Sequence, residues 1–181
     1  MPVGPLALQD MVGLDTSCFA GRVLAAAYSD RMVATSLMDD LVKAGRLGKK
    51  SGAGFRKYPP PKGKPTPDPD FQPFLEKNRT ASREISAEEI TDRLFLSMLL
   101  EAVRTFEEGI VREPAHVDMG LILGVGFPPF KGGILRWCDT EGAGKIIDRA
   151  AKYASLGKRF EPSPLLRDMA KSGKLFYPRP G

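Results

Sequence analysis

Residues 4–13, GPLALQDMVG, recur in altered form as residues 133–142, GILRWCDTEG. The positions that stay identical, at a constant spacing of 129 residues, are Gly4 and Gly133, Leu6 and Leu135, Asp10 and Asp139, and Gly13 and Gly142. A second pair follows, because residues 37–47, LMDDLVKAGRL, match residues 165–175, LLRDMAKSGKL, at a spacing of 128. This period is too long for a solenoid repeat and predicts a duplicated helical domain. Chance agreement at turn-forming glycines and aspartates is the alternative.

Helical periodicity dominates the chain and strand-like alternation is nearly absent, so we expect an all-α fold. In the first half, Asp15 can cap a helix that runs to about Tyr28. Ser36 can cap a second helix, which Gly45 ends. The apolar residues of the first helix fall on one stripe, made of Phe19, Val23, Leu24 and Ala27.

The strongest helix signal opens the second half. Ser86 and Glu89 have the spacing of a capping box, and a helix to about Gly109 should follow. We expect its buried stripe to contain Ile90, Leu94, Met98, Ala102, Val103 and Phe106. Further helices are expected from Pro114, over residues 143–156, and over residues 164–172, the last capped by Ser163 and ended by Gly173.

Between the halves the composition changes. Residues 58–69 contain six prolines, which remove backbone donors and favour an extended, polyproline-like segment. We therefore expect a first domain over residues 1–58, a Pro-rich linker and connecting segment over 59–85, and a second domain over 86–181.

Composition limits the class of protein. Apolar residues make up 42% and charged residues 27% of the chain, and no run of about 18 apolar residues or signal-peptide pattern is present. We expect a soluble, cytoplasmic protein without a membrane span. The net charge of +5 permits an anionic partner. The basic residues Arg46, Lys49, Lys50, Arg56 and Lys57 could hold phosphate, although a solvated loop is favoured and no nucleic-acid motif accompanies them.

Few residues have the chemistry of a self-contained site. Cys18 and Cys138 are too isolated for a disulfide framework or a metal site, so no metal ligands are expected. His116, the one histidine, is expected at the surface or at a helix start rather than in catalysis. The glycine-rich residues 124–133 could cradle a ligand, but without a preceding strand they favour a closely packed bend.

Residues 2–16 together with 45–58 resemble the C-terminal helical domain of the L-3-hydroxyacyl-CoA dehydrogenases. Residues 124–133, with Asp139 and Gly142, are similar to the second copy of that domain in the multifunctional fatty-acid β-oxidation enzymes. The resemblance implies two tandem copies. It also implies that the first copy is truncated at its N-terminus, because its long leading helix would precede Pro2, and that Met1 is internal to a longer protein.

The resemblance places catalysis outside this chain. In the family a Rossmann domain binds NAD and a His–Glu pair moves the proton, and neither has a counterpart here. We expect no catalytic residue in the chain and no activity from it alone. Asp92 and Arg93 stand where the first copy's missing helix carries an Asn-Arg pair, which argues against a second active site.

One cofactor contact follows from the resemblance. Lys50 matches the family lysine that reaches the NAD of the neighbouring domain, and an ammonium on a glycine-flanked loop can approach a pyrophosphate. Leu123 stands where multifunctional relatives often have a substrate-contacting tyrosine, which argues against a substrate role for the second copy.

Two functions stay open. The first is the C-terminal part of an NAD-dependent dehydrogenase, packed on the Rossmann domain over acyl-CoA, with a thiolase subunit as a partner. The second is a non-catalytic dimerisation or interaction module. Without its leading helix, the first copy should expose Leu6, Leu8, Val12 and Phe19, and this patch predicts self-association, domain exchange, or binding of the missing part of the parent enzyme.

Overall fold

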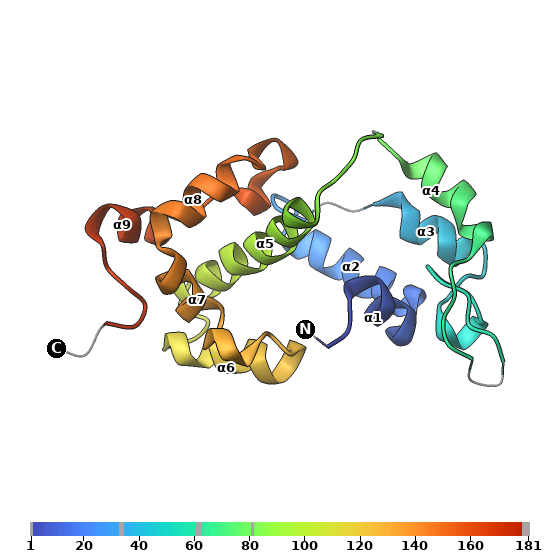
Figure 1. Cartoon of the computed structure of the whole chain (residues 1–181), viewed down its shortest axis with the longest axis horizontal. Coiled ribbons are helices and arrows are strands. Elements are labelled where there is room, and N and C mark those ends of the chain that lie inside the picture. Colours follow the sequence, from blue (N-terminus) through green and yellow to red (C-terminus); the bar gives the residue numbers. More distant parts are fainter. Residues whose placement is uncertain (1, 33–34, 61–62, 81, 179–181) are drawn as a thin grey trace. The chain divides into compact units, whose positions relative to one another are not determined.

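The computed structural model describes residues 2–32, 35–60, 63–80 and 82–178, and the chain forms two compact units. We call residues 2–83 the first lobe and residues 84–181 the second lobe. Within the described ranges the regular secondary structure is helical (Figure 1). The β-structure there is limited to isolated bridges between Gly48 and Ala53, Ala53 and Lys57, and Lys57 and Thr66. The predicted all-α fold is confirmed. None of the described helices has the length and apolar content to cross a membrane.

The first lobe contains α1 (Pro5–Val12), α2 (Leu14–Ala27), α3 (Ser36–Lys43) and α4 (Gln72–Asn78). Gly13 joins α1 to α2 with a φ of 103°, a conformation that residues with a side chain rarely adopt. The cap of α3 is Thr35 rather than the expected Ser36, because the Thr35 hydroxyl accepts a hydrogen bond from the Leu37 amide at 3.3 Å. Ser36 instead donates to the Asn78 side chain at the end of α4.

The α4 helix lies inside the segment expected to connect the lobes. It packs beside α3 (Figure 1), and a 3₁₀ turn (η2, Pro69–Phe71) leads into it. Phe71 and Phe74 pack against the small buried core of this lobe, which consists of Leu14, Leu41 and Phe55. Among the described residues of the range 58–69, where proline was expected to exclude helix, only Pro69 is helical, as the first residue of η2. The α4 helix begins after this range, and the proline in its first turn lacks only a donor that would be unpaired anyway.

The second lobe contains α5 (Ala87–Glu107), α6 (Pro114–Val125), α7 (Ile134–Glu141), α8 (Ala143–Ala151) and α9 (Pro164–Ser172). The expected caps of α5 and α9 are confirmed, since Ser86 accepts from the Glu89 amide at 3.1 Å and Ser163 from the Leu166 amide at 3.4 Å. Gly173 ends α9 in the left-handed conformation, as expected. The helix predicted over residues 143–156 ends at Ala151, and a separate 3₁₀ turn (η4, Ala154–Leu156) follows.

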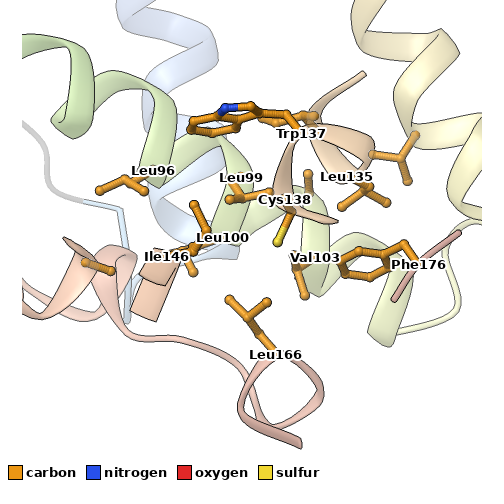
Figure 2. Close-up of a cluster of buried hydrophobic side chains, with 14 of the residues drawn as sticks. Leu96, Leu99, Leu100, Val103, Leu135, Trp137, Cys138, Ile146, Leu166 and Phe176 are labelled. Atoms are coloured by element: carbon orange, nitrogen blue, oxygen red, sulfur yellow. The ribbon is translucent and has the colours of Figure 1, made fainter. Parts of the chain in front are cut away.

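The core of the second lobe forms around α5. Figure 2 shows its leucines and Val103 gathered with side chains from α7, α8, α9 and the C-terminal segment. The fully buried positions of α5 are Leu96, Leu99, Leu100 and Val103. The expected stripe was wrong at the start of the helix, where Ile90 and Leu94 are 49% and 46% exposed. The buried face there passes through Asp92, a polar residue that a search for apolar periodicity leaves out.

Candidate functional site

Lys50 lies in a short, internally bonded loop of the first lobe. Residues 48–54 form this loop around a 3₁₀ turn (η1, Lys49–Ser51), and the Gly48 amide closes it by donating to the Ala53 carbonyl at 2.8 Å. The Ser51 hydroxyl donates to the Ala53 carbonyl at 2.9 Å and accepts from the Leu47 amide at 2.8 Å. The loop is therefore fixed by its own hydrogen bonds before any partner binds.

Asp10 attaches this loop to α1. Its fully buried carboxylate accepts from the amides of Phe55 and Arg56 at 2.9 and 3.2 Å and from the Tyr58 hydroxyl at 2.9 Å. Burial and this hydrogen bond to Asp10 raise the pKa of Tyr58 to about 12. The close contact between Asp10 and the backbone at residue 54 requires glycine there, because a Cβ atom on Gly54 would lie 1.9 Å from Asp10 Oδ1. A carboxylate with these donors has its charge satisfied inside the protein.

The Lys50 side chain pairs with Asp15 in the first turn of α2. The ammonium Nζ lies 2.5 and 2.7 Å from the two carboxylate oxygens, and both side chains are about half exposed. The hydrogen bond from Lys50 is the main reason that the pKa of Asp15 lies below its ordinary value, and the Thr16 amide adds to it. Gly13 leaves room for the pair, since a Cβ there would lie 2.9 Å from Lys50 Nζ.

The basic residues of this cluster differ in whether they hold the loop together or face solvent. Arg46 is mostly buried, and its guanidinium donates to the Gly54 carbonyl at 2.7 Å and to Asp68 at 2.6 Å. This contact holds the pKa of Asp68 below its ordinary range. Arg46 is thus a structural residue, whereas Lys49, Lys50, Arg56 and Lys57 are exposed in the described structure.

The second lobe repeats the carboxylate anchor without the loop. Asp139, the counterpart of Asp10, accepts from the amides of Phe176 and Tyr177, both at 2.9 Å. Phe176 directly follows Leu175, the counterpart of Leu47, so residues 48–54 have no equivalent there. The loop that carries Lys50 is an insertion specific to the first lobe.

Asp92 of the second lobe is committed to an internal network. It is 2% exposed and pairs with Arg149, while the Tyr153 hydroxyl lies 3.4 Å from it. Arg149 also approaches Glu141 at 3.5 Å, and Glu141 accepts from the Trp137 indole at 3.0 Å. The charge of Asp92 is balanced inside the lobe and its side chain is buried, which argues against contact with a substrate.

The other residues that the sequence analysis considered for a functional role belong to the second lobe, whereas Lys50 belongs to the first. His116 is exposed at the start of α6, as expected, and Leu123 on the same helix is also exposed. Close packing explains the glycine-rich bend, because a Cβ at Gly133 would lie 2.1 Å from Asp118 Cγ. Searched over the described part of the chain, His, Cys, Asp and Glu side chains form no group able to hold a metal ion.

Two contacts of the site were not predicted. Asp15 was interpreted only as a helix cap, and its pairing with Lys50 joins residues far apart in the chain, for which the sequence gives no signal. Asp10 did carry a signal, because it is one of the positions identical in the internal repeat. Its role as an anchor could have been inferred from that identity.

Comparison with known families identifies the domain type. The model of the "3-hydroxyacyl-CoA dehydrogenase, C-terminal domain" matches residues 1–58 and 90–178. The chain is 41% identical to the fatty acid oxidation complex subunit alpha of Pseudomonas paraeruginosa strain PA7, over 97% of this chain and 25% of that protein. It is 42% identical to the subunit alpha of Pseudomonas savastanoi pv. phaseolicola, with the same coverage. The chain spans about a quarter of the length of these relatives.

Solved structures share the fold. The dehydrogenase part of multifunctional enzyme 1 from C. elegans superposes with a TM-score of 0.65 and 22% identity, over 91% of this chain and 38% of that one. 3-Hydroxybutyryl-CoA dehydrogenase from Escherichia coli K12 gives a TM-score of 0.70 and 20% identity, over 95% of this chain and 52% of that one.

Proposed function

The chain belongs to the 3-hydroxyacyl-CoA dehydrogenase family through the C-terminal domain of that family, and on this premise we propose that it is the C-terminal helical part of an NAD-dependent L-3-hydroxyacyl-CoA dehydrogenase of fatty-acid β-oxidation. The observation that most strongly supports this proposal is the family match over residues 1–58 and 90–178. In the proposed reaction 3-hydroxyacyl-CoA is oxidised to 3-ketoacyl-CoA while NAD⁺ becomes NADH and a proton is released.

In this proposal Lys50 contacts the NAD pyrophosphate. Its ammonium has three N–H donors, and the two oxygens of Asp15 leave one of them available to an anion. The glycines around it keep the loop accessible, since a Cβ at Gly52 would meet only the Tyr58 carbonyl, at 3.8 Å. These features fit one phosphate contact. The remainder of the NAD site is assigned to a Rossmann domain outside this chain, on which the helical lobes pack and close the acyl-CoA cleft.

The chain by itself is proposed to be inactive. Bound NAD supplies the hydride acceptor of the reaction, and the proton must leave to a base beside the substrate hydroxyl. His116 is the single histidine of the sequence, and it lies exposed on α6. The base is proposed to come from the same Rossmann domain as the remainder of the NAD site.

The relatives support a place in a larger assembly. They are named as alpha subunits of a fatty acid oxidation complex. We extend this to a cytoplasmic complex in which a thiolase subunit consumes the 3-ketoacyl-CoA product. A non-catalytic interaction module is the second candidate, and the exposure of Leu6, Leu8, Val12 and Phe19 on α1 and α2 favours it.

One chimera separates the two functions. Residues 1–181 replace the corresponding C-terminal part of the full-length Pseudomonas subunit alpha, and NADH formation from 3-hydroxyacyl-CoA is measured. The dehydrogenase proposal expects the chimera to recover activity that the truncated subunit lacks, and residues 1–181 alone to give none. A correctly folded chimera as inactive as the truncated subunit would favour the interaction module instead.

A further inference from the structure

The second lobe has a pocket between α8, α9 and the residues that join these two helices, which Figure 1 shows in orange and red. Its volume of about 440 Å³ lies within the range of small-ligand sites. Most of the lining side chains are apolar, and they are Ile147, Ala151, Ala154, Phe160 and Pro162. The pocket can therefore hold an apolar group of a ligand.

The joining segment is held in place from two sides. Arg104 of α5 donates to the carbonyls of Lys158 and Glu161 at 3.0 and 2.5 Å. Arg167 of α9 donates through its Nε atom to the Pro162 carbonyl at 3.1 Å. The wall of the pocket and the guanidinium of Arg167 thus have defined positions before any ligand binds, which lowers the entropy cost of binding.

Three charged side chains also line the pocket, those of Lys158, Glu161 and Arg167. A terminal nitrogen of Arg167 lies 3.6 Å from Glu161 Oε1, which is too far for a hydrogen bond, and both side chains are about half exposed. An exposed pair of this kind contributes little to stability, so another carboxylate can replace Glu161. In the part of the chain that the structure describes, the Lys158 ammonium has no hydrogen-bond or ion-pair partner. Two cations against one carboxylate leave a single positive charge at the pocket.

The internal repeat provides a comparison for this charge. A cavity of about 280 Å³ lies between α2 and α3 of the first lobe, and Arg22 and Asp39 in its lining pair at 2.6 Å. At the spacing of 128–129 residues these two positions correspond to Ala151 and Arg167. In the second lobe a small side chain thus replaces the arginine, and a cation replaces the carboxylate. The second-lobe pocket has gained both space and an uncompensated positive charge.

We propose that the second-lobe pocket binds an amphipathic monocarboxylate, a compound in which an aliphatic chain ends in one carboxylate. The chain contacts the apolar lining, and the carboxylate accepts hydrogen bonds from Arg167 and Lys158 in place of Glu161. The planar guanidinium matches a carboxylate in geometry, and the single net charge of the pocket matches a monoanion. This inference rests on the second lobe alone and does not depend on dehydrogenase activity or on the contact between Lys50 and NAD.

The test titrates octanoate into the full chain of 181 residues at neutral pH. Methyl NMR of Ile147 and Ala154 reports binding at the pocket, and Met38 in the first-lobe cavity is the reference. Octanol and octylammonium have the same chain without the carboxylate, and octyl phosphate carries more negative charge. We expect octanoate to bind about tenfold or more tightly than octanol and octylammonium. Tighter binding of octyl phosphate than of octanoate would overturn the assignment of a monocarboxylate.

Variants of the chain complete the test. Arg167→Gln should weaken octanoate binding about tenfold, whereas Lys145→Gln, which removes an exposed lysine of α8 outside the pocket, should bind octanoate like the parent chain. The double variant Ala151→Arg with Arg167→Asp reproduces the charged pair of the first lobe and should abolish binding. Equal affinities for octanoate and octanol, equal responses of Ile147 and Met38, or an unchanged affinity in Arg167→Gln would each overturn the proposal.

Discussion

Asp10 and Asp139 occupy equivalent positions in α1 and α7, and each carboxylate accepts hydrogen bonds from two consecutive backbone amides of the segment that returns after the last helix of the repeat. In the first lobe these amides belong to Phe55 and Arg56, and in the second lobe to Phe176 and Tyr177. The shared anchor tolerates the insertion of residues 48–54 between the helix and the anchored segment. That insertion carries Lys50, which therefore has no equivalent in the second lobe.

The anchor depends on close approach at Gly54. We expect Gly54→Ala to destabilise the first lobe by about 3 kcal/mol, because the new Cβ would lie 1.9 Å from Asp10 Oδ1. Gly21→Ala is the matched control. It has open space and a helical position, so it should stabilise the lobe by about 0.5–1 kcal/mol. Urea unfolding followed at the Met38 methyl group measures the free energy of unfolding of both variants. Equal changes in the two variants would contradict the role of Asp10 as an anchor.

Tyr58 makes the stability of the first lobe depend on alkaline pH. Its pKa in the folded protein is about 12, above the ordinary tyrosine value of about 10. The stability that this difference supplies is complete below about pH 10 and is lost as pH rises toward 12. We expect Tyr58→Phe to unfold with less dependence on pH in this window, as measured by urea unfolding at several pH values. An unchanged dependence would exclude Tyr58 as its source.

Several features of the fold followed from local chemistry in the sequence. The caps Ser86 and Ser163 and the terminating Gly173 act through neighbours within a few residues, and these predictions are confirmed. The identity of Asp10 and Asp139 in the repeat pointed to a shared role, but their hydrogen bonds to backbone amides were not predicted. The α4 helix was missed because proline obscures a helix start, and the ion pair of Lys50 with Asp15 depends on tertiary packing, which local patterns do not encode.

Arg46 and Asp68 form a partly buried ion pair in the first lobe. Since the Asp68 side chain is nearly inaccessible, Asp68→Asn should cost about 1–3 kcal/mol by leaving the guanidinium without its anion. The lowered pKa of Asp68 means that its contribution is complete above about pH 4 and is lost as pH falls below this value. Acid unfolding of the Asp68→Asn variant should accordingly show a weaker pH dependence. An exposed control, Asp30→Asn, should leave the acid transition in place.

The two cysteines should differ in reactivity. Burial raises the pKa of both thiols, that of Cys138 to about 12, but Cys18 is only partly buried and lines a cavity between α2 and α3. With iodoacetamide at neutral pH, mass spectrometry should find Cys18 modified well before Cys138. Cys138 should react only when the second lobe opens. Modification of Cys138 at the rate of Cys18 in the folded protein would contradict the described core.

The most direct test of the proposed function is the apparent KM for NAD of the chimeric dehydrogenase with Lys50→Ala compared with Lys49→Ala. Both variants remove one exposed lysine from the same loop, but Lys50 is the one paired with Asp15. We expect Lys50→Ala to raise the KM for NAD about tenfold with little change in the KM for 3-hydroxyacyl-CoA, and Lys49→Ala to resemble the parent chimera. Equal KM values for NAD in the two variants would contradict the assignment of Lys50 to the cofactor.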